Sequence, residues 1–151
     1  PDVFTPGSAH STYCSNPLGV RAAYEVMSIV EEDEKKLEHD IPIKSARFMN
    51  GLKYLQSKYN SIGDVDGIGF ALRMELTQKD GITPNRELCD ALQEEGLKGD
   101  LSYNGKKCGL VLNNGGFYKN IITLVPQLYI TEEEIDMAID LFDQLFSRFE
   151  K

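Results

Sequence analysis

Apolar residues recur every three or four positions in several segments of the chain, which is the spacing of one buried face of an α-helix. The first segment begins at Asn16, whose side chain suits the free N–H groups of a first turn, and at Pro17, whose missing donor costs nothing there. We expect this helix to fade into the acidic run at 31–34 and the pattern to be broken by Pro42. Its predicted buried stripe consists of Leu18, Ala22, Val26, Ile29 and Val30.

The same spacing predicts two further helices. One is closed by polar and glycine residues at 60–63, and its apolar face falls at four-and-three spacing. That face consists of Phe48, Leu52, Leu55 and Tyr59. The other helix has Thr83 as its cap and Pro84 as its first residue, and it ends at Gly96. The residues expected to face inward from it are Leu88 and Leu92.

The last helix has a complete start signal. Thr131 and Glu134 form a capping box, and Ile130 and Ile135 flank it as a hydrophobic staple. The apolar stripe that follows consists of Ile135, Ala138, Ile139, Phe142, Leu145, Phe146 and Phe149. Such a stripe needs another element to cover it.

Between these helices the period changes to that of strands. Glycines mix with β-branched and apolar residues over 62–76, which indicates a strand with a close backbone approach at Gly67 and Gly69. Segments 109–112 and 121–125 are predicted to pair antiparallel around a turn between them. The predicted fold class is α+β, a small and mostly antiparallel sheet with helices packed on one face.

Composition narrows the class of protein. The 151 residues suit one domain, and 41% of them are hydrophobic. The net charge of −8 argues against a nucleic-acid partner, because phosphates are held by clustered lysine and arginine. No apolar stretch has the length of a membrane span. The widely spaced Cys14, Cys89 and Cys108 signal neither disulfides nor zinc, so we expect a cytoplasmic protein.

One segment carries most of a calcium-loop pattern. Asp64, Asp66, Gly69 and Glu75 occupy loop positions one, three, six and twelve. Ile68 stands at position five, where a ligand is needed, and no exit helix follows. A strand entered through a glycine turn is therefore favoured, and no metal site is predicted.

The two histidines do not indicate a catalytic or metal site. His10 and His39 have no partners at metal-ligand spacing. A nucleophilic pair of His10 and Cys14 lacks a third group to orient it, so an ordinary thiol near a helix start is favoured. No catalytic residue is predicted in this chain.

Ser11 and Thr12 stand shortly before the first predicted helix. The free N–H groups and the dipole of a helix N-terminus favour an anion, and hydroxyl groups can donate to it. The same two residues also suit an ordinary turn. The residues alone leave both interpretations open.

Four blocks of the chain, in order, resemble class III pyridoxal-phosphate aminotransferases of the ornithine, acetylornithine and 4-aminobutyrate type. The blocks are HSTYCSNPLGVRAAYEVMSIVEEDE, IGDVDGIGFALRMEL, ALQEEGL and NIITLVPQLYITEEEID. They correspond to the stretch after the cofactor lysine, the strand with an Arg-Gly-x-Gly-Leu motif, a helix with a late glycine, and the Pro-Pro-Leu signature with its Thr-Glu-Glu cap.

The resemblance implies a division of the chain. Residues 1–16 would be a lead-in segment from a large domain, upstream of Pro1, that carries the cofactor lysine. Residues 17–151 would be the C-terminal small domain, including the long connecting helix, of a fold-type I enzyme that binds pyridoxal 5′-phosphate. Thr12, with Ser11 beside it, corresponds to the threonine that reaches across a homodimer to the cofactor phosphate of the neighbouring subunit.

The resemblance also implies an activity. The complete enzyme is expected to pass an amino group from an amine, ω-amino or amino acid donor to an oxo-acid acceptor, and this chain alone is expected to be inactive. Thr123 stands where most of the family has the arginine that clamps the substrate α-carboxylate. Either the donor lacks that carboxylate or another residue binds it. Asp66 likewise replaces the arginine of Arg-Gly-x-Gly, and Gln127 replaces the second proline of Pro-Pro-Leu.

Two alternatives stay open. A related pyridoxal-phosphate decarboxylase or aminomutase would share the small domain, and a stand-alone acidic α+β module would bind a ligand or a protein without catalysis. The reading frame upstream of Pro1 distinguishes an enzyme from the stand-alone module, because only an enzyme needs a long in-frame segment that contains a lysine after a strand.

Overall fold

The computed structural model describes residues 16–150, which divide into two compact units between Glu38 and His39. In the first unit, α1 (Pro17–Glu32) begins as predicted, because the Asn16 side chain accepts from the N–H groups of Leu18 at 3.0 Å and Gly19 at 3.3 Å. The predicted buried stripe is wrong for the described residues, since no α1 residue is buried and Leu18 is 80% exposed. An amphipathic helix buries a face only where another element covers it.

Helix α2 (Glu34–Lys58) contains Pro42, so the predicted break at this proline is wrong. The interruption lies instead at Asp33, the C-cap of α1. One missing N–H donor is tolerated in α2 because buried residues after the proline, such as Leu52 and Leu55, anchor the helix in the core. Within residues 16–150, no helix is long and apolar enough to cross a membrane.

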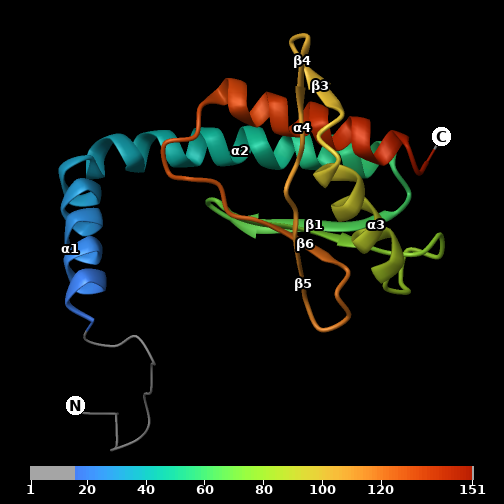
Figure 1. The fold of residues 1–151 in the computed structure, drawn as a ribbon, viewed down its shortest axis with the longest axis horizontal. Coiled ribbons are helices and arrows are strands. Elements are labelled where there is room, and N and C mark those ends of the chain that lie inside the picture. Colours follow the sequence, from blue (N-terminus) through green and yellow to red (C-terminus); the bar gives the residue numbers. More distant parts are fainter. Residues whose placement is uncertain (1–15, 151) are drawn as a thin grey trace, which may run out of the picture. The chain divides into compact units, whose positions relative to one another are not determined.

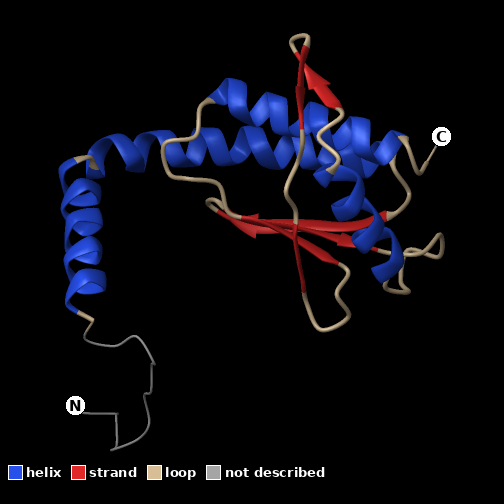
Figure 2. Ribbon diagram, in the orientation of Figure 1, coloured by secondary structure: helices blue, strands red, loops and turns tan. Residues whose placement is uncertain are grey.

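The second unit is built on a four-stranded antiparallel sheet with the order β1-β2-β6-β5. Its strands are β1 (Ile62–Ile68), β2 (Ala71–Leu76), β5 (Asn113–Gly115) and β6 (Ile121–Leu124). Helices α2 and α4 (Glu132–Ser147) lie side by side over one face of this sheet (Figure 1). Helices and an antiparallel sheet thus form separate layers (Figure 2), which confirms the predicted α+β class.

The core lies between the sheet and these helices. Alternate residues of β2 point into it, and Met74 faces Ile122 of β6 in register, with both side chains fully buried. Leu52 and Leu55 of α2 and the aromatic residues of α4 complete the cluster. The largest fully buried side chains of α4 are Ile135, Phe142, Leu145 and Phe146.

The predicted single strand at 62–76 is a hairpin of β1 and β2 that turns at Gly69, where φ is +53°. The predicted close approach is confirmed at Gly67, because a Cβ added there would lie 2.4 Å from the carbonyl oxygen of Ala71, and it is wrong at Gly69, where the nearest atom is a side-chain carbon of Ile41 at 3.9 Å. Only glycine suits the position of Gly67, which has a φ of +154°.

Helix α3 (Arg86–Leu97) starts later than predicted. Its cap is Asn85, whose side chain accepts from the N–H of Leu88 at 3.1 Å, rather than Thr83. Pro84 instead forms an isolated bridge with Thr77. Because Pro84 takes part in this strand-like pairing, it cannot be the first residue of the helix, and α3 begins only at Arg86. The predicted end near Gly96 is correct to within one residue.

A second sheet was not predicted from the sequence. It is the hairpin of β3 (Leu101–Tyr103) and β4 (Lys106–Cys108), which turns at Asn104 and Gly105. Their φ values of 49° and 75° suit the Asn-Gly turn of a two-residue hairpin. The predicted strand at 109–112 is wrong, because β5 begins only at Asn113, inside the predicted turn.

Helix α4 begins with the predicted capping box, in which the hydroxyl of Thr131 accepts from the N–H of Glu134 at 3.2 Å. Ion pairs join its exposed side to α2. Arg47 donates to Asp136 at 2.8 and 2.6 Å, and Lys58 bonds Asp143 at 2.6 Å. The hydrogen bond to Asp143 raises the pKa of Lys58, so this lysine stays charged.

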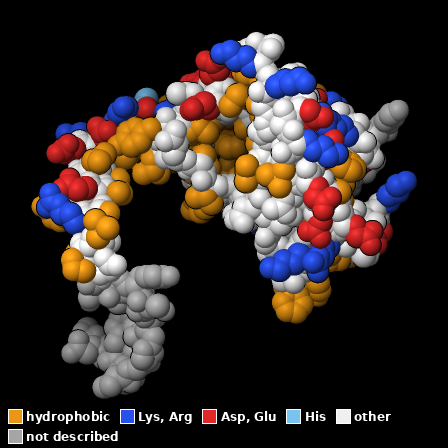
Figure 3. Space-filling model, viewed as in Figure 1, with side chains coloured by type: hydrophobic (Ala, Val, Ile, Leu, Met, Phe, Trp, Pro, Cys, Tyr) orange, Lys and Arg blue, Asp and Glu red, His pale blue; other side chains and the backbone are white. Residues whose placement is uncertain are grey.

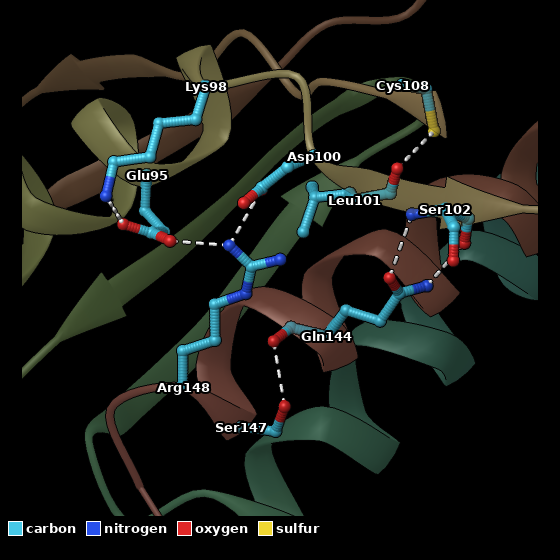
Figure 4. Close-up of polar contacts among 9 residues, drawn as sticks. All are labelled: Glu95, Lys98, Asp100, Leu101, Ser102, Cys108, Gln144, Ser147 and Arg148. Carbon is cyan, nitrogen blue, oxygen red and sulfur yellow. Dashed lines mark hydrogen bonds and ion pairs between the residues drawn. The ribbon is translucent and has the colours of Figure 1, made fainter. Parts of the chain in front are cut away.

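The C-terminal end of α4 is tied to α3 and to β3 (Figure 4). Arg148 donates to Glu95 and, at 2.8 Å, to Asp100. Gln144 exchanges two hydrogen bonds with the backbone of Ser102, at 3.1 and 2.8 Å. The Arg148 guanidinium lowers the pKa of Asp100, while Lys98 and then Arg148 lower the pKa of Glu95.

Substituting Gly96 by alanine should destabilise the protein. The added Cβ would lie 2.2 Å from the carbonyl oxygen of Leu110. The backbone of Leu110 is already held against this helix, because its N–H donates to the carbonyl of Gly96 at 3.0 Å. Overpacking of this kind costs about 1–3 kcal/mol. Urea unfolding of Gly96→Ala measures the loss, and the exposed helix position Glu94→Ala is the matched control. Equal stability of the two variants would contradict the close packing.

The Arg148 pairs predict a dependence of stability on pH. The two partners of Arg148, Glu95 and Asp100, both have a lowered pKa in the folded state. Their contribution to the free energy of unfolding is therefore present above their ordinary pKa values of 4.5 and 3.8 and is lost as the pH falls below them. The melting-temperature difference between wild type and Arg148→Met should therefore be largest near pH 6 and shrink towards pH 3. Arg86→Met, which removes a surface pair within α3, is the control. A difference that stays constant down to pH 3 would refute the link.

Candidate functional site

The candidate site residues near the start of the chain lie outside the residues that the structure describes. These are His10, Ser11, Thr12 and Cys14. The described chain starts at the N-terminus of α1, where the Asn16 side chain bonds the N–H groups of Leu18 and Gly19. The next N–H, of Val20, bonds the Asn16 carbonyl at 2.9 Å. The first turn therefore has its donors engaged by Asn16, as its predicted capping role implies, and offers no free N–H group to an anion.

Thr123 lies on β6, on the sheet face turned away from α2 and α4. Its neighbour Ile122 is fully buried on the opposite face, and successive side chains of a strand alternate between faces. In register, Arg73 of β2 and Asn113 of β5 flank Thr123 on its two sides. The half-buried Thr123 thus stands at the centre of the outer sheet face, which we take as the candidate functional surface.

Arg73 is the cation of this outer face, and three carboxylates hold it. Its Nη2 lies 2.8 Å from Asp64 and 3.5 Å from Asp66, and its Nη1 lies 3.5 Å from Glu75. Because three acids surround one guanidinium, the cluster beside Thr123 carries a net negative charge. Arg73 is engaged on the β1 side and leaves Thr123 as an uncharged polar contact.

The acids of this cluster are those of the calcium-loop pattern. In the structure Asp64 and Glu75 face each other across the β1–β2 hairpin, so they extend along two strands instead of encircling one point. Within residues 16–150, no group of three His, Cys, Asp or Glu residues is placed to hold a metal ion. The carboxylates neutralise Arg73.

An apolar cleft adjoins Thr123 where β5 and β6 stop pairing. Its volume is about 330 Å³, and the extended segments 110–113 and 123–126 form its two sides. The buried side chains of Phe48 and Phe142 form its floor. Figure 3 shows hydrophobic side chains gathered in a hollow on the side of the molecule that faces the viewer. Thr123 therefore lines an apolar cleft whose floor belongs to α2 and α4, while the charged cluster lies beside it on the outer face of the sheet.

The remaining candidate side chains are not poised for chemistry. Burial raises the pKa of the Cys89 thiol to about 11, so it stays protonated and unreactive near neutral pH. His39 is exposed and bonds Asp40 at 3.0 Å, which lowers the pKa of that acid. Both are structural or surface residues.

Arg73 is the functional candidate that sequence reasoning missed. The available signal was the alternation of Arg73 and Glu75 with Leu72, Met74 and Leu76, which places the charges on one face of a strand. Reading 62–76 as one strand concealed it, because only a hairpin brings Asp64 opposite β2.

Comparison with known proteins places this chain beside one family. The class-III aminotransferase model matches residues 1–146. A 5-aminovalerate aminotransferase of Pseudomonas putida is 28% identical over 146 residues, covering 97% of this chain and 32% of that protein. An alanine/serine racemase of Pyrococcus horikoshii is 28% identical over 140 residues, covering 93% and 27%. The chain thus spans about a third of the length of such relatives.

Comparison of the fold with solved structures leads to the same family. The crystal structure of an adenosylmethionine-8-amino-7-oxononanoate aminotransferase from Methanocaldococcus jannaschii superimposes with a TM-score of 0.71 at 26% identity. The match covers 93% of this chain and 30% of that one. The described elements therefore have the arrangement found in one part of a larger aminotransferase.

Proposed function

Because the chain belongs to the class-III aminotransferase family, we propose that it is the C-terminal small domain of an enzyme that transfers an amino group from a donor to an oxo-acid with pyridoxal 5′-phosphate. The family match over residues 1–146 carries this proposal. Residues 1–16 form the lead-in from the large domain, and residues 17–151 form the small domain. The large domain supplies the catalytic lysine, so this chain by itself is inactive.

The exposure of α1 supports a larger assembly. No described residue of α1 is buried, and the apolar residues Leu18, Tyr24 and Met27 are between 62% and 80% exposed. Exposed apolar residues gathered on one helix indicate an interaction with further protein. We assign this interaction to the rest of the subunit and to the second subunit of a homodimer.

Ser11 and Thr12 are the proposed ligands of the cofactor phosphate. Since the first turn of α1 has its N–H groups bonded to Asn16, the hydroxyls and not the helix would donate to the phosphate. Hydroxyl donors fit an anion that is held and not attacked. When bound, the cofactor supplies the electron sink for amino transfer, and the protein supplies binding and orientation.

Thr123 is the proposed substrate contact, and its surroundings indicate the class of donor. Threonine offers no charge to an α-carboxylate, and Arg73 beside it is already paired with three acids. The net negative cluster disfavours a carboxylate and favours an amine. The adjoining apolar cleft suits an uncharged hydrocarbon portion. The favoured donor is an amine, or an ω-amino compound whose carboxylate lies elsewhere.

A related reaction on the same cofactor is the second candidate. The relative from Pyrococcus horikoshii is named an alanine/serine racemase at the same 28% identity as the aminotransferase relative. The small domain is thus shared between reactions. Product analysis with an L-amino acid distinguishes them, because transfer consumes an oxo-acid while racemisation yields the D-isomer without one.

The phosphate role of Thr12 predicts weaker cofactor binding in Thr12→Ala. A hydrogen bond to a charged group is worth about 1.5–3 kcal/mol, so the dissociation constant for pyridoxal 5′-phosphate should rise by about tenfold or more. Spectroscopic titration of the full-length apoenzyme measures this constant. Ser15→Ala, in the same segment, is the control. A constant equal to that of wild type would remove Thr12 from the phosphate site.

The role of Thr123 predicts donor preference. Wild-type enzyme should have a higher kcat/KM for monoamines than for α-amino acids, and Thr123→Arg should shift that ratio towards α-amino acids by about tenfold or more, because a guanidinium can bind the carboxylate bidentately. Thr123→Val, which adds no charge, should not produce the shift.

Arg73→Met tests whether Arg73, instead of Thr123, determines how the substrate α-carboxylate is received. If the wild-type enzyme uses α-amino acids strongly and this variant abolishes that use, Arg73 and not Thr123 determines the class of donor. Strong use that survives Arg73→Met would defeat the inference of a donor without an α-carboxylate.

A further inference from the structure

Three asparagines of this chain are followed directly by glycine, namely Asn50, Asn104 and Asn114. In such a pair the backbone nitrogen of the glycine can attack the side-chain amide carbon of the asparagine, because glycine has no Cβ to shield that nitrogen or to restrict the backbone. The attack also requires the backbone to rotate at the asparagine. The surroundings of each pair therefore determine which of the three can react.

Two of these pairs are held by the fold. Asn50 lies inside α2, and a Cβ added to the following Gly51 would lie 2.5 Å from the side chain of Ile139, so this backbone is packed against α4. The side-chain nitrogen of Asn114 donates to the carbonyl oxygen of Cys89 at 3.1 Å. Neither pair can rotate without loss of these contacts.

The third pair forms the two-residue turn between β3 and β4. Asn104 is exposed, and its side chain makes no hydrogen bond within residues 16–150. A Cβ added to Gly105 would meet no atom within 4 Å, so nothing crowds this end of the turn. The closed turn fixes both residues at positive φ, and the rotation needed for attack therefore requires the hairpin to open.

The hairpin that carries this turn is a weak element. Strands β3 and β4 have three residues each and form a two-stranded sheet of their own. Such a hairpin is marginally stable by itself, and it opens at a lower cost in free energy than the whole fold. Gln144 of α4 attaches it to the helices through two hydrogen bonds with the backbone of Ser102.

We propose that Asn104 is a site of spontaneous modification, at which the chain deamidates when the β3–β4 hairpin opens. The backbone nitrogen of Gly105 bonds to Cγ of Asn104 and loses its proton, while the Cγ–Nδ2 bond breaks and ammonia leaves. Water then breaks one of two C–N bonds in the five-membered ring. Breakage at Cγ yields aspartate, and breakage at the main-chain carbonyl carbon yields isoaspartate. The net change consumes one water and releases one ammonia.

Isoaspartate alters the hairpin permanently. Its main chain runs through the side-chain carbons and is one carbon longer, so the two-residue turn no longer fits the register of the strands. The hairpin forms one side of a cavity of about 520 Å³ whose other side is the start of α4. Tyr103, Cys108 and Met137 contribute apolar surface to this cavity. Formation of isoaspartate therefore exposes apolar surface, and it accumulates with the age of the protein.

The test ages the full-length protein near neutral pH and follows each asparagine by tryptic peptide mapping. Asn50, Asn104 and Asn114 fall in separate peptides, 48–53, 99–106 and 108–119. In the folded protein, peptide 99–106 should convert to aspartate and isoaspartate forms about tenfold or more faster than the other two, because the fold holds those. Equal rates of the three peptides overturn the proposal. So does an unchanged peptide 99–106 under conditions in which the urea-unfolded chain deamidates there.

Gln144→Leu tests whether the hairpin controls the reaction. Loss of both bonds to Ser102 should raise the rate for peptide 99–106 by about fivefold or more and leave the other two peptides unchanged. Gln56→Leu, which removes a glutamine bond to the backbone of Gly63, is the matched control and should keep the wild-type rate. An unchanged rate in Gln144→Leu overturns the proposal, and so does a rise shared equally by all three peptides.

Asn104→Asp separates the new charge from the longer backbone. Aspartate suits the same turn, so this variant should keep the β3–β4 amides protected from hydrogen exchange. Aged protein that contains isoaspartate should lose that protection, while the amides of β2 and β6 keep theirs. Full hairpin protection in the isoaspartate form would refute the structural consequence.

Discussion

The burial of Met74 against Ile122, beneath α2 and α4, is the constraint on which the rest of the second unit depends. A slip of one residue in the β2–β6 register would place Arg73 in the core, where an unpaired charge is prohibitively costly. The core therefore determines which residues face outward. Arg73 and Thr123 share the outer face as a direct consequence of apolar packing on the inner one.

Polar contacts orient the helices over this core. Arg47 and Lys58 join α2 to α4, and Arg148 joins the end of α4 to α3 and the segment before β3. These groups are partly exposed, and ion pairs in contact with solvent contribute little to stability, so their main effect lies in orientation. Holding α4 in place also holds the chain after it, where the Glu150 carboxylate accepts from the backbone N–H groups just before β1.

The family match and the sheet geometry bear on different parts of the proposed function. Membership of the class-III aminotransferases supports the proposed chemistry of amino transfer, for which the proposal places the catalytic lysine in the large domain. The proposed choice of donor rests on the outer face, where Thr123 is uncharged and Arg73 is neutralised by its acids. Relatives that share the domain but carry different reaction names fit this separation of chemistry from specificity.

The sequence by itself determined features that rest on neighbouring residues. The Asn16 cap, the capping box of Thr131 and Glu134 and the close approach at Gly67 were predictable because each depends on interactions a few residues apart. The class α+β followed from the change of hydrophobic period. Tertiary structure decided what depends on distant packing: helix α2 runs through Pro42 because the core anchors the residues beyond it, and register alone brings Arg73 beside Thr123. Long-range contacts outweigh local preferences there, and no local pattern encodes which strands become neighbours.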